Sequence, residues 1–135
     1  MTSLVTLTLD DAETAPTHGV PEPARCFELL REVELLKRGS QYQATGHAAR
    51  TLYKSPSFRV VLIVLRSRAE LKEHKTNHPV SIQLLEGAIR VAMPVRFVEP
   101  VACGLVVIEP GVRRDVTALT DSAFVLSLPW SEHDC

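Results

Sequence analysis

From residue 41 onward, short apolar runs alternate with turn signals along the chain. The runs are rich in β-branched residues, and none of them keeps a helical spacing for long. The dipeptides SP, HP, EG, MP, CG, PG and TD separate them. We therefore predict strands at residues 48–53, 58–65, 80–85, 88–91, 96–98, 105–108, 115–118 and 123–128. Short strands at this spacing, after a single helix, indicate an all-β antiparallel sandwich or barrel.

The region before residue 41 carries a different pattern. Residues 4–9 alternate as a short strand, which we expect to be an added edge strand, and a proline-containing loop follows. Residues 22–38 then repeat apolar side chains at three- and four-residue spacing, namely Cys26, Leu29, Leu30, Val33 and Leu36. Pro23 suits the first turn of a helix and Gly39 suits its end. We predict one helix whose apolar face packs on the core or in a dimer.

Length and charge limit the class of protein. A chain of 135 residues fits one domain, with an N-terminal extension at 1–40, a barrel at 41–130 and a tail at 131–135. The 15 Lys and Arg residues nearly balance the 16 Asp and Glu residues, and no basic cluster is dense enough to predict nucleic acid or a membrane as a partner. The first residues lack the features of a signal peptide, so we expect a cytoplasmic location.

Two stretches carry a recognisable motif pattern. His74 and Gly87 stand at a fixed spacing, and Gly111 lies in EPGVRRDV, which continues into VTALTDSAFVLSL. Residues 46–128 thereby resemble a small single-domain, RmlC-like cupin, a double-stranded β-helix or jelly-roll barrel. The first motif of such cupins is glycine, five residues, His-x-His, three or four residues, Glu, six residues and Gly. The second is glycine, five residues, Pro-x-Gly, two residues and His. The resemblance implies the barrel fold but no single activity.

The departures from these motifs fall on the metal ligands. Counted from His74 and Gly87, the other positions of the first motif hold Arg68, Thr76 and Val80. In the second motif the proline falls on Glu109 and the histidine on Arg114, and Gly104 stands one residue late. Of the four ligands that the resemblance implies, only His74 is in place.

Other residues offer a partial replacement for the missing ligands. His78 and Gln83 are candidates beside His74, with His47 as a third from a neighbouring strand, for iron, manganese, nickel or zinc. A regular strand from Val80 would place Gln83 on the opposite face. The barrel interior therefore holds Val80 or Gln83, but not both without a bulge. The sequence leaves this choice open.

Arg114 favours a different kind of ligand. A guanidinium stays protonated, has five donors and no acceptor, and would repel a metal cation. It grips a carboxylate or phosphate in a bidentate manner. Arg114, with His74, His78 and Gln83 as neighbours, therefore predicts an anionic small molecule, and no cofactor is predicted. The alternatives are that Arg114 turns outward or pairs with an acidic neighbour in the chain, and that the histidines are only solvated.

Three functions remain as hypotheses. The first is a non-catalytic cupin barrel, a homodimer, that binds an anionic small molecule such as a carboxylate. The second is a metal-dependent dioxygenase or isomerase using His74, His78 and Gln83. The third is an interaction protein that docks through its N-terminal helix. No catalytic residue is assigned, because the sequence holds no strained serine elbow, no GxxxxGK loop and no GxGxxG motif.

Overall fold

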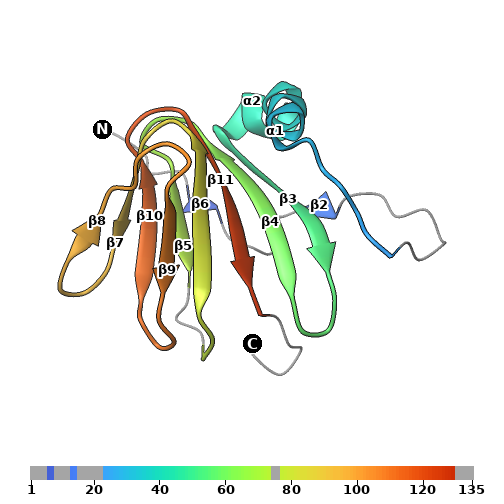
Figure 1. Ribbon diagram of the computed structural model, residues 1–135. Helices are drawn as coiled ribbons and strands as arrows, with labels where there is room; N and C mark the ends of the chain where they lie inside the picture. Colours follow the sequence, from blue (N-terminus) through green and yellow to red (C-terminus); the bar gives the residue numbers. More distant parts are fainter. Residues whose placement is uncertain (1–5, 8–12, 15–22, 74–76, 130–135) are drawn as a thin grey trace.

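Two β-sheets face each other in the computed structural model, which describes residues 6–7, 13–14, 23–73 and 77–129 (Figure 1). The five-stranded sheet has the order β1-β5-β10-β7-β8, and the six-stranded sheet has the order β2-β3-β4-β11-β6-β9. The strands of the first sheet are β1 (Thr6–Leu7), β5 (Glu70–Glu73), β7 (Ile89–Ala92), β8 (Phe97–Val98) and β10 (Arg114–Ala118). Those of the second are β2 (Glu13–Thr14), β3 (His47–Lys54), β4 (Arg59–Leu65), β6 (Val80–Glu86), β9 (Leu105–Ile108) and β11 (Ser122–Leu128).

The eight strands predicted after residue 41 are all present, and each observed end differs from its prediction by one residue at most. β1 is confirmed as an edge strand, since it ends the five-stranded sheet and runs parallel to β5. The sequence missed β5 because Leu71 is its only apolar residue, although that side chain is fully buried. It also missed β2, which has two residues.

Strand β4 separates two apolar layers. Val61, Ile63 and Leu65 belong to the core between the sheets, while Leu62 and Val64 pack on the outer face. A strand covered on both faces is apolar at nearly every position, which explains the unbroken run VVLIVL. The described ranges contain no helix long and apolar enough to cross a membrane.

The outer layer is formed by α1 (Leu29–Arg38) and α2 (Ser40–Thr45), which lie over β3 and β4 (Figure 1). Val33 and Leu36 of α1 are buried against the sheet, and Leu29 packs beside them. This part of the predicted apolar stripe packs within the chain, whereas Leu30, 63% exposed, and Cys26 do not. The prediction of a helix from residue 22 was wrong. The helix starts at Leu29 because the preceding segment, with Cys26 exposed, has no continuous face to bury.

The second helix, α2, was not predicted, because its six residues are too few to show an apolar period. It follows α1 directly after Gly39. Gly46 ends it in the left-handed conformation, with a φ of 81°, and the Gly46 backbone N–H donates to the Tyr42 carbonyl at 2.8 Å.

The sandwich has two different ends. We call the closed end the one where β4 and β6 finish and β11 begins, with the turns at 66–69, 87–88 and 119–121. We call the open end the one where β4, β6 and β10 begin and β9 finishes, with the hairpins at 55–58 and 93–96 and the loop at 109–113.

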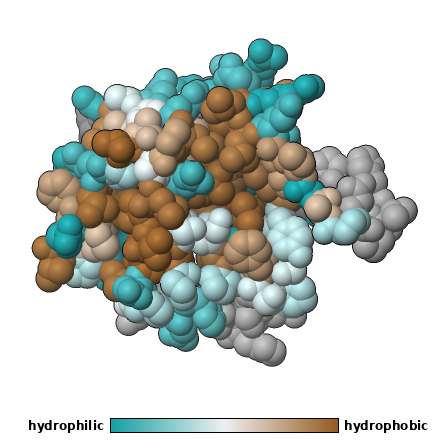
Figure 2. Space-filling model, viewed as in Figure 1, coloured by the Kyte–Doolittle hydropathy of each residue, from teal (hydrophilic) through white to brown (hydrophobic). Residues whose placement is uncertain are grey.

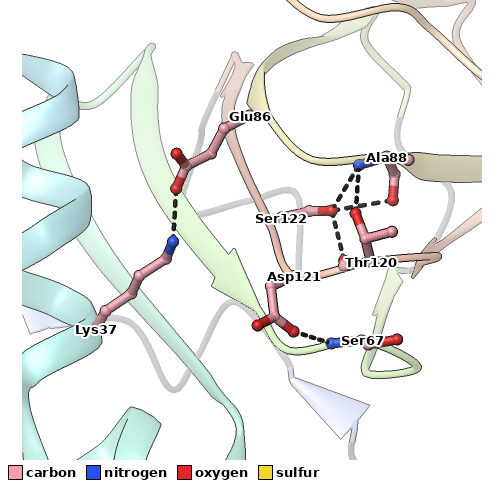
Figure 3. Close-up of polar contacts among 7 residues, drawn as sticks. All are labelled: Lys37, Ser67, Glu86, Ala88, Thr120, Asp121 and Ser122. Carbon is pink, nitrogen blue, oxygen red and sulfur yellow. Dashed lines mark hydrogen bonds and ion pairs between the residues drawn. The ribbon is translucent and has the colours of Figure 1, made fainter.

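Short polar contacts fasten the closed end (Figure 3). The Ser67 backbone N–H donates to Asp121 Oδ1 at 2.8 Å. The Ala88 backbone N–H donates to Thr120 Oγ1 and Ser122 Oγ, each at 3.0 Å. The Ser122 hydroxyl has carbonyl acceptors on Ala88 at 2.9 Å and on Thr120 at 2.7 Å. Ser122 is fully buried, so these bonds replace those it would make with water.

Candidate functional site

Arg114 begins β10 at the open end and points between the sheets. It shares a face with Val116 and Ala118, which are buried in the core, and its own side chain is 2% exposed. The register pairs its backbone with Glu73 on β5, and the side chain interacts with neighbouring groups of the chain. The alternative that Arg114 turns outward is therefore wrong.

A second arginine, Arg59, lies at the same end and was missed in the sequence. It begins β4, shares the inner face with Val61 and Ile63, and is 6% exposed. Its Nη2 donates to Oγ1 of the buried Thr51 at 3.1 Å. The signal was available, because Arg59 stands two residues before Val61 in a strand whose alternate positions face inward. The two sheets thus each send one buried guanidinium into the interior at the open end.

Gln83 was wrongly placed among the candidate ligands. It is exposed on the outer face of β6, while Val80, Ile82 and Leu84 are buried in the core. Strand β6 keeps a regular register with β9 from Val80 to Gln83, so no bulge brings Gln83 inside. The choice left open by the sequence is settled in favour of Val80.

The histidines lie apart from one another. His78 is half-buried in the loop before β6, at the same open end where Arg114 begins β10. His47 is buried at the start of β3, opposite Leu65, and so belongs to the closed end. The idea that His47 completes a site with His78 was therefore wrong. The prediction for His74 lies outside the described residues, and its role stays a prediction.

Two adjoining cavities open beside the Arg114 end of β10. They share Met93, Arg96 and Val112, from the β7–β8 hairpin and the β9–β10 loop, and their volumes are about 900 and 260 Å³. Neither cavity is lined by Arg114, Arg59 or His78. These two cavities therefore lie at the rim of the sandwich, and the smaller one lies over the edge strands β8 and β9.

Comparison with solved structures identifies the fold. A cupin superfamily protein from Desulfitobacterium hafniense matches with a TM-score of 0.65 and 10% identity, over 87% of this chain and all of that one. An RmlC-like cupin from Desulfovibrio desulfuricans matches with a TM-score of 0.57 and 17% identity, over 85% and 96% of the two chains. The protein has the cupin fold.

The cupin comparison does not extend to an activity. A mutant salicylate 1,2-dioxygenase from Pseudoaminobacter salicylatoxidans matches with a TM-score of 0.64 and 18% identity, over 76% of this chain but 34% of that one. No protein-family model and no curated protein matches the sequence. Identities this low show the fold alone, and the same fold carries many functions.

The described residues of this cupin-fold protein do not fit the metal centre that the sequence resemblance implies. Val80 is inside, where that centre has a carboxylate, and Arg114 is inside, where it has a histidine. Neither side chain has an acceptor for a metal ion. Among the residues that the structure describes, no three His, Cys, Asp or Glu side chains gather to hold one. We therefore derive no step through a metal.

Proposed function

We propose that this cupin-fold protein is a non-catalytic barrel that binds an anionic small molecule, with Arg114 as the anchor. The observation that supports the proposal is the inward, buried Arg114 side chain at the open end. A buried guanidinium carries its full charge and five donors, so it can hold neighbouring groups of the chain and still grip a carboxylate or phosphate. We expect the ligand to be a carboxylate, and we propose His78, which lies at the same open end, as a neighbouring residue of the site.

Electrostatics favours an anion over a cation at this position. Two unit charges about 4 Å apart interact by about 4 kcal/mol at an effective dielectric near 20. Arg114 supplies one such positive charge from the interior and Arg59 a second from the opposite sheet. Both stabilise a small anion and both oppose a divalent ion.

The first test is metal content, measured by mass spectrometry on untagged protein before and after dialysis against EDTA. We expect much less than one equivalent. Close to one equivalent of iron, manganese, nickel or zinc that survives dialysis would overturn the proposal in favour of the metal-dependent enzyme.

The second test is a thermal-shift screen with acetate, malonate and inorganic phosphate against chloride at equal ionic strength. We expect wild-type protein to gain several degrees with at least one of these anions, since a ligand at 100 times its dissociation constant contributes about 2.7 kcal/mol. Arg114→Met should abolish the gain. Arg114→Lys, which keeps the charge, should reduce the gain in melting temperature. This variant replaces Arg114→Met in the test if the methionine variant does not fold. The exposed Arg31→Met on α1 is the control. Equal gains in all variants would contradict the role of Arg114.

We also propose the homodimer that the sequence analysis expected, formed through β9. This strand ends the six-stranded sheet, and its outward Leu105 and Val107 are each 61% exposed. Figure 2 shows hydrophobic residues gathered over the region of β6 and β9. Apolar edge strands of this kind pair with a second copy. Light scattering of the wild-type protein should give the mass of a dimer. The double variant Leu105→Lys with Val107→Lys should give the mass of a monomer. A monomeric wild type would refute the proposed dimer.

A further inference from the structure

The cavities at the rim of the open end form a groove that is separate from Arg114. Its larger part is lined by the tip of the β7–β8 hairpin and by the β9–β10 loop. Its smaller part continues between the edge strands β8 and β9. The larger volume, about 900 Å³, falls in the range of sites for small molecules, and the smaller part adds about 260 Å³.

The walls of the two parts differ in chemistry. The larger part is lined by Arg96 and Arg113 beside Met93, Pro94, Val95 and Val112, with no acidic side chain. The smaller part is mainly apolar, with Val98, Val106 and Ile108, and contains one acid, Glu109, beside the shared Arg96. The groove is therefore positive at one end and apolar with one negative charge at the other.

The two groove arginines differ from a nearby arginine that is already paired. Arg90 on β7 forms an ion pair with Glu99 at 2.6 Å and lies over the Phe97 ring, 4.4 Å from its centroid. Arg96 and Arg113 are exposed, and no carboxylate among the described residues forms an ion pair with either. Their donors therefore face the cavity and solvent, where a ligand's carboxylate can take them.

We propose that this groove binds a small monocarboxylate with an apolar body. The carboxylate lies between Arg96 and Arg113, and the apolar body extends along Val98, Val106 and Ile108. Glu109, which lines the smaller part, repels a second anionic group, so a dicarboxylate of equal length binds less well. The inference goes beyond the proposed function, because the groove residues do not include the Arg114 anchor.

The test is an NMR titration of isotope-labelled full-length protein with hexanoate, adipate, hexanamide and inorganic phosphate. These probes separate an apolar monoanion from a dianion, a neutral isostere and an anion without an apolar body. We expect hexanoate to shift the backbone amides at 93–96 and 111–113, and to bind at least tenfold more tightly than any of the other three. Comparable binding of adipate, hexanamide or phosphate would overturn the proposal, as would hexanoate shifts confined to other residues.

Variants make the result specific to the groove. Arg96→Ala with Arg113→Ala should weaken hexanoate binding at least tenfold. The matched control is Arg31→Ala with Arg38→Ala, which removes the same charge from exposed sites on α1 and should leave binding within twofold. Equal losses in the two double variants would mean a general charge effect and overturn the site. Failure of the groove is distinct from failure of the Arg114 anchor, because the titration tests the groove through Arg96 and Arg113, while the thermal-shift screen tests the anchor through Arg114→Met.

Discussion

The two ends of the sandwich are built from the same strands but differ in their polar contacts and packing. At the closed end, short side chains and backbone groups of the turns satisfy one another, as in the Ser67–Asp121 and Ala88–Ser122 contacts. At the open end, two buried arginines face inward and a groove opens at the rim. The difference teaches that one end of the barrel is closed by its own turns, and it is at the other end that we propose binding. At the closed end the space beside Gly87 is filled, while at the open end two cavities lie at the rim.

Two glycines, one at each end, show how the packing of the closed end differs from that of the open end. Gly87 at the closed end and Gly111 at the open end both have a left-handed φ, 86° and 78°. A Cβ at Gly87 would collide with the Asp121 carbonyl oxygen and with Ser122 Oγ. A Cβ at Gly111 would meet nothing within 4 Å. The same substitution should therefore have unequal effects at the two ends.

Gly87→Ala is expected to have the largest effect on stability. Left-handed backbone strain costs an L residue about 1–2 kcal/mol, and forcing an extra methyl into a filled site adds about 1–3 kcal/mol. We expect the free energy of unfolding, measured by urea denaturation, to fall by about 3 kcal/mol. Gly111→Ala is the matched control and should lose only about 1 kcal/mol, from backbone strain alone. Equal losses would show that the open end is packed as tightly as the closed end.

The ion pair between Lys37 and Glu86 should have the smallest effect. Lys37 Nζ on α1 lies 2.6 Å from Glu86 Oε1 at the rim of the closed end (Figure 3). Burial by itself lowers the pKa of Lys37, but the hydrogen bond and charge of Glu86 more than offset it, so the pKa is raised above its usual 10.5. Because the folded state holds this proton more tightly, the stabilisation is complete below the usual value. It is lost as pH rises through the folded-state pKa.

We therefore expect Lys37→Met to lose about 0.5 kcal/mol of unfolding free energy at pH 7, as is typical of a largely solvated ion pair. The difference from wild type should disappear at alkaline pH. Burial also raises the pKa of Tyr42, so wild type and variant should both weaken there. Unfolding curves from pH 7 to 12 measure this, with the exposed Lys72→Met as control. A loss as large as that of Gly87→Ala would mean that ion pairing, rather than turn packing, fastens the closed end.

The site shows how far sequence reasoning could go. The motif spacing singled out Arg114, and its inward orientation agrees with the anion hypothesis. Arg59 was missed because it matches no motif. Its inward orientation becomes clear only from the inner face of β4, on which it lies. Gln83 was a plausible ligand by residue type, but the face of β6 on which it stands is exposed. The sequence could not show that Arg96 and Arg113 line one groove, because they lie on two loops that only the fold brings to the same cavity.

The sequence by itself determined eight strands of the barrel, though not β2 or β5, and the helical character of residues 29–38, because apolar spacing and turn residues act locally. It also determined which side chains share a face. Only the tertiary structure decided which face lies inside, as for Val80 against Gln83, and which sheet edges carry β1 and β9. The reason is that a period of two defines two equivalent faces. The choice between them depends on which elements, distant in the chain, cover each one.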